Sequence, residues 1–190
     1  AVLNAGRLEQ IGTPDEVYNR PETEYVATFL GAANLLLGVV SGGQVEIGTV
    51  MIPAREETER FRDGQAIKVV FRPEDVQLSK TGALPNGCHR LANGVIEEVD
   101  FVGAYERLML RLDLTARRPA EGQLPLHTVS NNVPERRTGV PVIVTRPKSE
   151  ASDAPFGVGD HVAVGLRTFR VLPNFALSTE QASRVVDVRS

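Results

Sequence analysis

A degenerate repeat of short alternating runs is the feature that most limits what this chain can fold into. In its first copy, Gly64 precedes apolar residues at Ile67, Val69 and Phe71, and the same spacing recurs 95 residues later, in the segment 159–171. Because successive side chains of a strand point to opposite faces of a sheet, each run places three apolar side chains on one face. The chain is therefore predicted to contain two related β units, interleaved or stacked. The corresponding residues are Gly64, Ile67, Val69, Phe71, Arg72 and Val76 in one copy and Gly159, Val162, Val164, Leu166, Arg167 and Val171 in the other.

The chain after Asn34 shows the same β character throughout. A weaker echo relates Gly38-Val39-Val40 to Gly94-Val95-Ile96. Polar segments at 115–124 and 148–155 are expected to be loops. Many short strands separated by such turns are typical of a sandwich or a small barrel. The predicted strands cover 35–40, 45–47, 67–71, 95–101, 108–114, 124–129, 140–145 and 162–166.

The first 31 residues follow a different pattern. Two strand-like runs around the turn 4–6 predict a hairpin, and Thr13 is an N-cap candidate for a helix that should end near Arg20. A second helix is expected to end at Gly31, with one apolar face made by Tyr25, Val26, Phe29 and Leu30. An isolated hairpin is marginally stable in water, and residue 1 is Ala rather than Met. We therefore expect the chain to be part of a longer protein.

Composition argues against several classes of protein. The net charge is −3, and the aromatic residues are 7 Phe and 3 Tyr, with no Trp. A nucleic-acid-binding protein needs a basic surface and benefits from aromatic side chains for stacking. Cys88 is the one cysteine, so neither an internal disulfide nor a zinc site with several cysteines can form. These counts argue against a nucleic-acid partner and a cysteine-based metal site.

Sequence motifs for catalysis are absent. The sequence contains no G-x-x-x-x-G-K-[ST], G-x-G-x-x-G, H-E-x-x-H, G-x-S-x-G or C-x-x-C. We therefore predict no catalytic, cofactor-binding or metal residues in this chain. The candidates for anion or interface contacts are Arg72, Glu74 and Asp75, which follow an apolar strand, and Arg167, which matches Arg72 in the repeat. The same turn could instead satisfy its own polar groups and end the strand.

Several segments resemble the ATP-binding subunits of ABC importers, in the maltose/polyamine/iron/sulfate-type group. Residues 3–21 are similar to the end of the ATPase domain in that family. Their sequence is Leu-Asn-Ala-Gly-Arg-Leu-Glu-Gln-Ile-Gly-Thr-Pro-Asp-Glu-Val-Tyr-Asn-Arg-Pro. Residues 25–34 resemble its join to a C-terminal extension. The segments 71–76 (Phe-Arg-Pro-Glu-Asp-Val), 94–103 and 159–173 resemble that extension, the TOBE (transport-associated OB) domain.

The resemblance implies a mainly β fold and a division into three parts. Residues 1–31 would be the C-terminal remnant of the ATPase domain, a short hairpin and two helices. Residues 32–175 would form an OB-fold-like TOBE barrel built from the two related β units, and residues 176–190 would be a tail.

The resemblance also implies a function, namely the C-terminal regulatory and dimerisation domain of an ATP-binding subunit. The family's Walker A, Walker B and signature motifs are missing here, so this chain is expected not to be an enzyme and to hold no cofactor, whereas the intact parent would use ATP and Mg²⁺. The implied partners are a second copy of the chain, membrane permease subunits and a substrate-binding protein, and the implied location is the cytoplasmic face of the cell membrane.

Two other functions remain open. The chain could be a small-anion sensor that regulates transport, for a phosphonate-, sulfate- or molybdate-like oxyanion, or, ranked last, a nucleic-acid-binding OB protein. The segment 141–150 is most similar to aminoethylphosphonate-type importers. The transported solute stays open among aminoethylphosphonate, polyamine, iron, sulfate and sugar.

Overall fold

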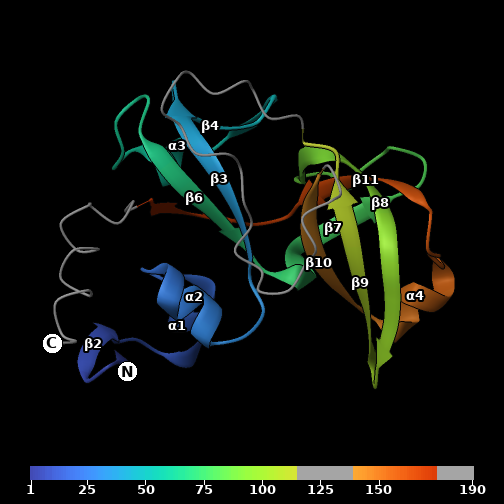
Figure 1. Cartoon of the computed structure of the whole chain (residues 1–190), viewed down its shortest axis with the longest axis horizontal. Coiled ribbons are helices and arrows are strands. Elements are labelled where there is room, and N and C mark those ends of the chain that lie inside the picture. Colours follow the sequence, from blue (N-terminus) through green and yellow to red (C-terminus); the bar gives the residue numbers. More distant parts are fainter. Residues whose placement is uncertain (115–138, 175–190) are drawn as a thin grey trace, which may run out of the picture.

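Two antiparallel five-stranded sheets dominate the computed structural model, which describes residues 1–114 and 139–174 (Figure 1). The first sheet has the order β12-β6-β3-β4-β5 and the second the order β10-β9-β8-β11-β7. The first is formed by β3 (Asn34–Ser41), β4 (Gln44–Ile47), β5 (Val50–Pro53), β6 (Ala66–Phe71) and β12 (Arg170–Pro173). The second is formed by β7 (Val76–Ser79), β8 (His89–Val102), β9 (Tyr105–Leu112), β10 (Val140–Pro147) and β11 (His161–Leu166).

The two sheets are copies of one arrangement that exchange a strand. Read from the opposite edge, the second sheet runs β7-β11-β8-β9-β10, which matches β12-β6-β3-β4-β5 strand for strand. After β6 the chain crosses to the second sheet as β7, and after β11 it crosses back to the first as β12. The repeat predicted from the sequence is therefore real, and its units are interleaved. The predicted pair of Val76 with Val171 is wrong, because Val76 lies opposite Leu166 whereas Val171 lies opposite Val69. The mainly β class, preceded by a hairpin and two helices, is confirmed.

Matched glycines show how closely the two units correspond. Gly38 lies opposite Ile67, and Gly94 lies opposite Val162, which is the equivalent of Ile67 in the repeat. A Cβ atom at Gly38 would lie 2.9 Å from the carbonyl oxygen of Glu46, and one at Gly94 would lie 3.1 Å from that of Arg111. Both positions need glycine because the neighbouring strand passes too close for a side chain.

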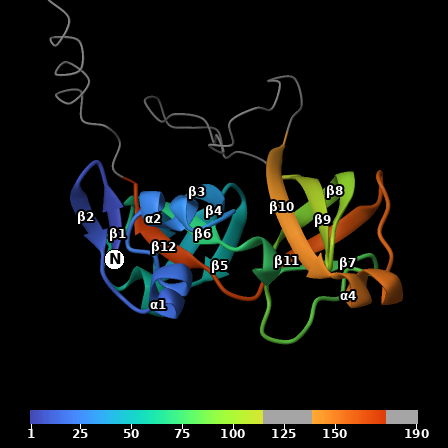
Figure 2. The ribbon, with the colours of Figure 1, turned by 90° about the horizontal axis from the view of Figure 1, so that it is seen from below.

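One apolar core runs through both sheets. The alternating residues of the repeat are all buried, and they pack in a single cluster with residues from strands of both units. Burial of this kind is the main favourable term in folding. The two sheets lie side by side in Figure 2, and the shared core joins the two units.

The N-terminal segment packs beside the first sheet (Figures 1 and 2). It contains β1 (Val2–Asn4), β2 (Arg7–Gln10), α1 (Pro14–Asn19) and α2 (Glu24–Phe29). Thr13 caps α1, as the sequence predicts, and Glu16 completes a reciprocal capping box with it. The predicted apolar face of α2 is wrong in one respect, because Phe29 is 60% exposed and stacks on Tyr25.

Several elements differ from the prediction. The segment expected to be a loop at 148–155 forms α4 (Lys148–Asp153), and α3 (Arg55–Thr58) was not predicted. Strands β5, β7 and β12 were also missed, and a one-turn helix, η1 (Pro73–Asp75), separates β6 from β7. The predicted strand 124–129 and the proposed tail 176–190 lie outside the described residues. Within the described ranges, no helix has the length and apolar character needed to span a membrane.

Candidate functional site

The turn after β6 holds the N-terminal helices against the first sheet. Arg72 ends β6 and is only 5% exposed. Its Nη1 donates to the carbonyl oxygens of Ala27 at 2.7 Å and Ala32 at 3.3 Å, and its Nη2 donates to that of Tyr18 at 2.8 Å. Hydrogen bonds from a charged donor to otherwise unpaired helix carbonyls are among the stronger ones in proteins. These hydrogen bonds of Arg72 therefore go to backbone oxygens.

Tyr18 connects this turn to the surface through a second bond. Its ring lies 4.0 Å from the guanidinium carbon of Arg72, and its hydroxyl donates to Glu74 at 2.7 Å. Burial, together with the bond to Glu74, raises the pKa of the Tyr18 phenol. Burial lowers the pKa of Arg72, whose guanidinium nevertheless stays protonated at physiological pH.

An ion pair adds to the same interface. Lys68 on β6 pairs with Glu24 in the first turn of α2. The acidic side chain there also complements the positive end of the helix dipole. The N-terminal segment is thus attached to the β units by hydrogen bonds, an aromatic contact and an ion pair.

The structure brings the two arginine turns of the repeat together. The backbone amide of Arg167 donates to the carbonyl oxygen of Asp75 at 2.8 Å. Arg167 itself is exposed, in contrast to the buried Arg72. The four candidates from the sequence therefore lie near one another, but their side chains have different environments.

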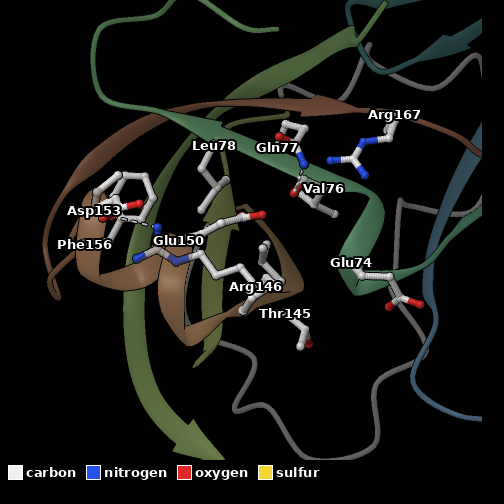
Figure 3. A pocket seen from close by; sticks show the side chains of 13 residues that line it. Glu74, Val76, Gln77, Leu78, Thr145, Arg146, Glu150, Asp153, Phe156 and Arg167 are labelled. Carbon is white, nitrogen blue, oxygen red and sulfur yellow. Dashed lines mark hydrogen bonds between the residues drawn. The ribbon is translucent and has the colours of Figure 1, made fainter. Parts of the chain in front are cut away.

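Glu74 and Arg167 lie at the rim of a cleft between β7 and β10 (Figure 3). The cleft has a volume of about 420 Å³ and is bounded on one side by α4. Its apolar lining comes mainly from both edge strands. The lining residues are Glu74, Val76, Gln77, Leu78, Val144, Thr145, Arg146, Pro147, Glu150, Asp153, Ala154, Phe156 and Arg167.

A buried ion pair forms one end of this cleft. Arg146 is 8% exposed, and its Nε donates to Glu106, which is 2% exposed, at 2.5 Å. Its Nη1 donates to the carbonyl oxygen of Ala154 at 2.7 Å, and its guanidinium carbon lies 4.4 Å from the Phe156 ring centre. Nη2 is buried and has no hydrogen-bond partner within residues 1–114 and 139–174. The contacts with Glu106, Ala154 and Phe156 hold the Arg146 side chain in position.

A second ion pair lies next to that end. Lys80 Nζ lies 2.7 Å from a carboxylate oxygen of Asp160 and also faces the Phe156 ring. The hydrogen bond from Lys80, followed by that from the Gly157 amide, lowers the pKa of Asp160. These contacts fix the chain between α4 and β11.

The charges with no partner lie elsewhere on the cleft wall. Across the described part of the chain, the side chains of Glu150, Asp153 and Arg167 form no hydrogen bond or ion pair. Figure 3 shows Glu150 extending its carboxylate toward β7, while Arg167 directs its guanidinium toward Gln77. The arrangement can bind a charged small molecule. A cluster of three or more metal-ligating side chains does not occur among the residues that the structure describes.

Sequence reasoning missed the α4 side of this cleft. Glu150 and Asp153 lie in the polar segment 148–155, which was interpreted as a loop, and Arg146 was not singled out. The available signal was Pro147 immediately before Lys-Ser-Glu, because proline is tolerated at the beginning of a helix and an acidic residue suits its first turn.

Comparison with known proteins relates the chain to importers. No family model matches it. It is 39% identical over 127 residues to the spermidine/putrescine import ATP-binding protein PotA of Oleidesulfovibrio alaskensis, a match that covers 64% of this chain and 32% of that protein. It is 46% identical over 82 residues to the sulfate/thiosulfate import ATP-binding protein CysA of Caulobacter vibrioides, covering 43% of this chain and 23% of that one.

The chain thus matches about a third or less of the length of these curated relatives. Among solved structures, the cytoplasmic molybdate-binding protein ModG with molybdate bound gives a TM-score of 0.47 at 13% identity, covering 73% of this chain and 92% of that one.

Proposed function

Because its homologues are ATP-binding subunits of ABC importers, we propose that the chain is the C-terminal regulatory and dimerisation part of such a subunit. The observation that carries the proposal is the attachment of residues 1–31 to the β units through Arg72. A rigid connection of this kind lets the β units respond to, or restrain, movement of the domain to which the N-terminal helices belong.

Exposed apolar side chains on the N-terminal segment support the proposal that another domain covers this segment. Leu3, Leu8, Ile11 and Phe29 are between 55% and 70% exposed. Exposed apolar groups that gather on one small segment are typical of a surface that packs against another domain or protein. In this proposal, the covering element is the remainder of the ATPase domain, which would bind ATP and Mg²⁺.

The proposal extends to the complete importer. The intact subunit would hydrolyse ATP, pair with a second copy of itself, and work with membrane permease subunits and a substrate-binding protein. It would lie on the cytoplasmic face of the membrane. The solute is left open between polyamine, sulfate, aminoethylphosphonate, iron and sugar.

Reconstitution of the complete subunit with its permease subunits tests this proposal. We expect ATP hydrolysis that depends on both components, and we expect Arg72→Ala to weaken the coupling of hydrolysis to solute uptake. Arg62→Ala is the control, because Arg62 is exposed and lies away from both the N-terminal helices and the cleft. A complete protein that neither binds nor hydrolyses ATP would contradict the proposal.

Self-association is tested separately. Sedimentation velocity of the 190-residue chain at increasing concentration should show a dimer if the β units carry the interface. A persistent dimer interface buries at least about 1,000 Å² in total. A monomer at all concentrations would remove dimerisation from the proposed role.

A second candidate function is the sensing of a small ligand, and the cleft favours it. Arg72 donates hydrogen bonds to backbone carbonyl oxygens, whereas the guanidinium of Arg167 at the cleft has no partner among the described residues. Thermal-shift measurements with phosphate, sulfate, molybdate and simple phosphonates test the candidate against Arg167→Gln. A flat response to all of these and to larger charged ligands would leave this candidate unsupported.

A further inference from the structure

The two β units differ at the gap between the two edge strands of each sheet, β5 and β12 in the first and β10 and β7 in the second. In the first unit, α3 follows β5 and bridges the gap to β12. Glu57 on α3 accepts a hydrogen bond from the amide of Val171 at 3.1 Å and pairs with Arg170. Arg60 Nη2 donates to the carbonyl oxygen of Val171 at 2.5 Å. The edge of β12 is therefore covered by side chains of the same unit.

The second unit leaves the corresponding gap open. Helix α4 follows β10 as α3 follows β5, but no hydrogen bond joins an α4 side chain to β7 in the described ranges. Leu78 on β7 pairs with Val164, just as Val171 on β12 pairs with Val69, the repeat equivalent of Val164. Leu78, and not Val76 as the 95-residue spacing predicts, therefore occupies the place of Val171, and it lines a cleft instead of meeting a counterpart of Glu57. The volume of about 420 Å³ is in the range of small-molecule sites.

The cleft has opposite free charges on either side of an apolar lining. Glu150 and Asp153 lie three residues apart on α4, and Figure 3 shows Glu150 extending toward β7 while Asp153 lies beside Phe156. Arg167 approaches from the β11 side (Figure 3). The apolar lining includes Val76, Leu78 and Val144, whereas Figure 3 shows Phe156 beside Asp153, at the end of the cleft away from Arg167.

The remaining charges at the cleft are already neutralised or used. Arg146 is paired with Glu106, and Glu74 accepts the hydroxyl of Tyr18. Figure 3 shows the Glu74 carboxylate directed away from Glu150. The free groups that a ligand would meet are thus one guanidinium and the two α4 carboxylates.

We propose that this cleft binds a small ω-amino acid, in which an aliphatic spacer separates an ammonium group from a carboxylate. The ammonium contacts Glu150, the carboxylate contacts Arg167, and the spacer covers the apolar lining between them. A diamine would place one cation against Arg167, and a dicarboxylate would place one anion against the α4 acids. Like charges held close together are unfavourable. The inference rests on the second candidate function, that this cleft senses a ligand, and it names the class of that ligand.

Isothermal titration calorimetry on the 190-residue chain tests the ligand class. The probes are β-alanine, 4-aminobutanoate and 6-aminohexanoate, together with diamines and dicarboxylates of matching length. We expect at least one amino acid to bind roughly tenfold more tightly than its matched diamine and dicarboxylate, since one charged hydrogen bond contributes about 1.5 kcal/mol.

Substitutions connect binding to the named residues. Glu150→Gln and Arg167→Gln should each weaken binding roughly tenfold, whereas Arg167→Glu should shift the preference to the diamine. Glu56→Gln on α3 and Arg62→Gln are the controls, because both residues are exposed and lie in the other unit. Circular dichroism verifies that each variant is folded.

The outcomes separate the two proposals. The inference is overturned if no amino acid binds, if diamines or dicarboxylates bind equally well, or if the cleft variants behave like the controls. Binding of phosphate or sulfate alone, lost in Arg167→Gln, would support ligand sensing at the cleft while overturning the ω-amino acid assignment.

Discussion

The guanidinium carbon of Arg72 lies 4.0 Å from the centre of the Tyr18 ring, and Nη2 of the same arginine donates a 2.8 Å hydrogen bond to the Tyr18 carbonyl oxygen. Tyr18 is in the last turn of α1, where helix carbonyls lack partners within the helix. Arg72 also bonds to Ala27 in α2. One side chain at the end of β6 therefore fixes both N-terminal helices.

Replacing Arg72 by lysine should destabilise the protein by about 3 kcal/mol. Lysine retains the positive charge, but it cannot reproduce the forked hydrogen bonds or stack on the ring in the same way. Urea denaturation of the 190-residue chain measures the change. Arg167→Lys, at the equivalent and exposed position, should change stability by less than about 0.5 kcal/mol. Equal effects of the two substitutions would show that the contacts of Arg72 do not matter for stability.

Replacing Tyr18 by phenylalanine should alter how stability depends on pH in the alkaline range. The folded-state pKa of Tyr18 is raised above its usual value of about 10. Its contribution is therefore fully present below pH 10 and is lost as the pH rises through the folded-state pKa. Tyr18→Phe lacks this contribution, so its deficit relative to the unsubstituted chain should shrink between pH 8 and pH 11.

Denaturation series at several pH values measure that deficit. Tyr105→Phe is the control, because Tyr105 is 53% exposed and its removal also deletes one phenol. The same pH dependence in both variants would contradict the assignment of the effect to the bond between Tyr18 and Glu74.

The repeat could be predicted from the sequence because buried positions on a strand alternate with exposed ones and must carry apolar residues. Ile67, Val69 and Phe71 face one core together with their counterparts 95 residues later, and alternation is the direct consequence of strand geometry. Gly38 and Gly94 could also be matched, because a close backbone approach leaves no room for other residues.

The strand exchange and the cleft could not be predicted in this way. β7 (Val76–Ser79) and β12 (Arg170–Pro173) are four residues each, too short for alternation to be distinguished from chance. Which sheet each joins depends on contacts that are distant in sequence. The different surroundings of Arg72 and Arg167 have the same origin, because only Arg72 lies beneath the N-terminal helices.

Asn34 should be essential for holding the two sheets together. Its side-chain amide donates to the carbonyl oxygen of Ile143 and accepts from the amide of Ile143, both at 2.8 Å. Asn34, at the beginning of β3, thereby pairs with the backbone amide and carbonyl of Ile143 on β10. Asn34→Ala leaves this donor and acceptor without that partner. We expect a loss of about 2 kcal/mol in urea denaturation. Asn93→Ala, at an exposed position, should cost less than about 0.5 kcal/mol, and a similar loss in both would contradict this role.

Glu106 should be required to neutralise Arg146 at the base of the cleft. The two side chains are 3% and 9% exposed, and Nη2 of Arg146 already lacks a partner. Glu106→Gln removes the counter-charge and leaves a buried guanidinium uncompensated, which should cost about 3 kcal/mol. In the double variant Glu106→Leu with Arg146→Met both charges are gone, so its loss of stability should be smaller than that of Glu106→Gln. Glu150→Gln, an exposed carboxylate of the same cleft, is the control, with an expected change below about 0.5 kcal/mol. If the double variant were the less stable of the two, the pair would be contributing more through its hydrogen bonds and packing than it costs in desolvation.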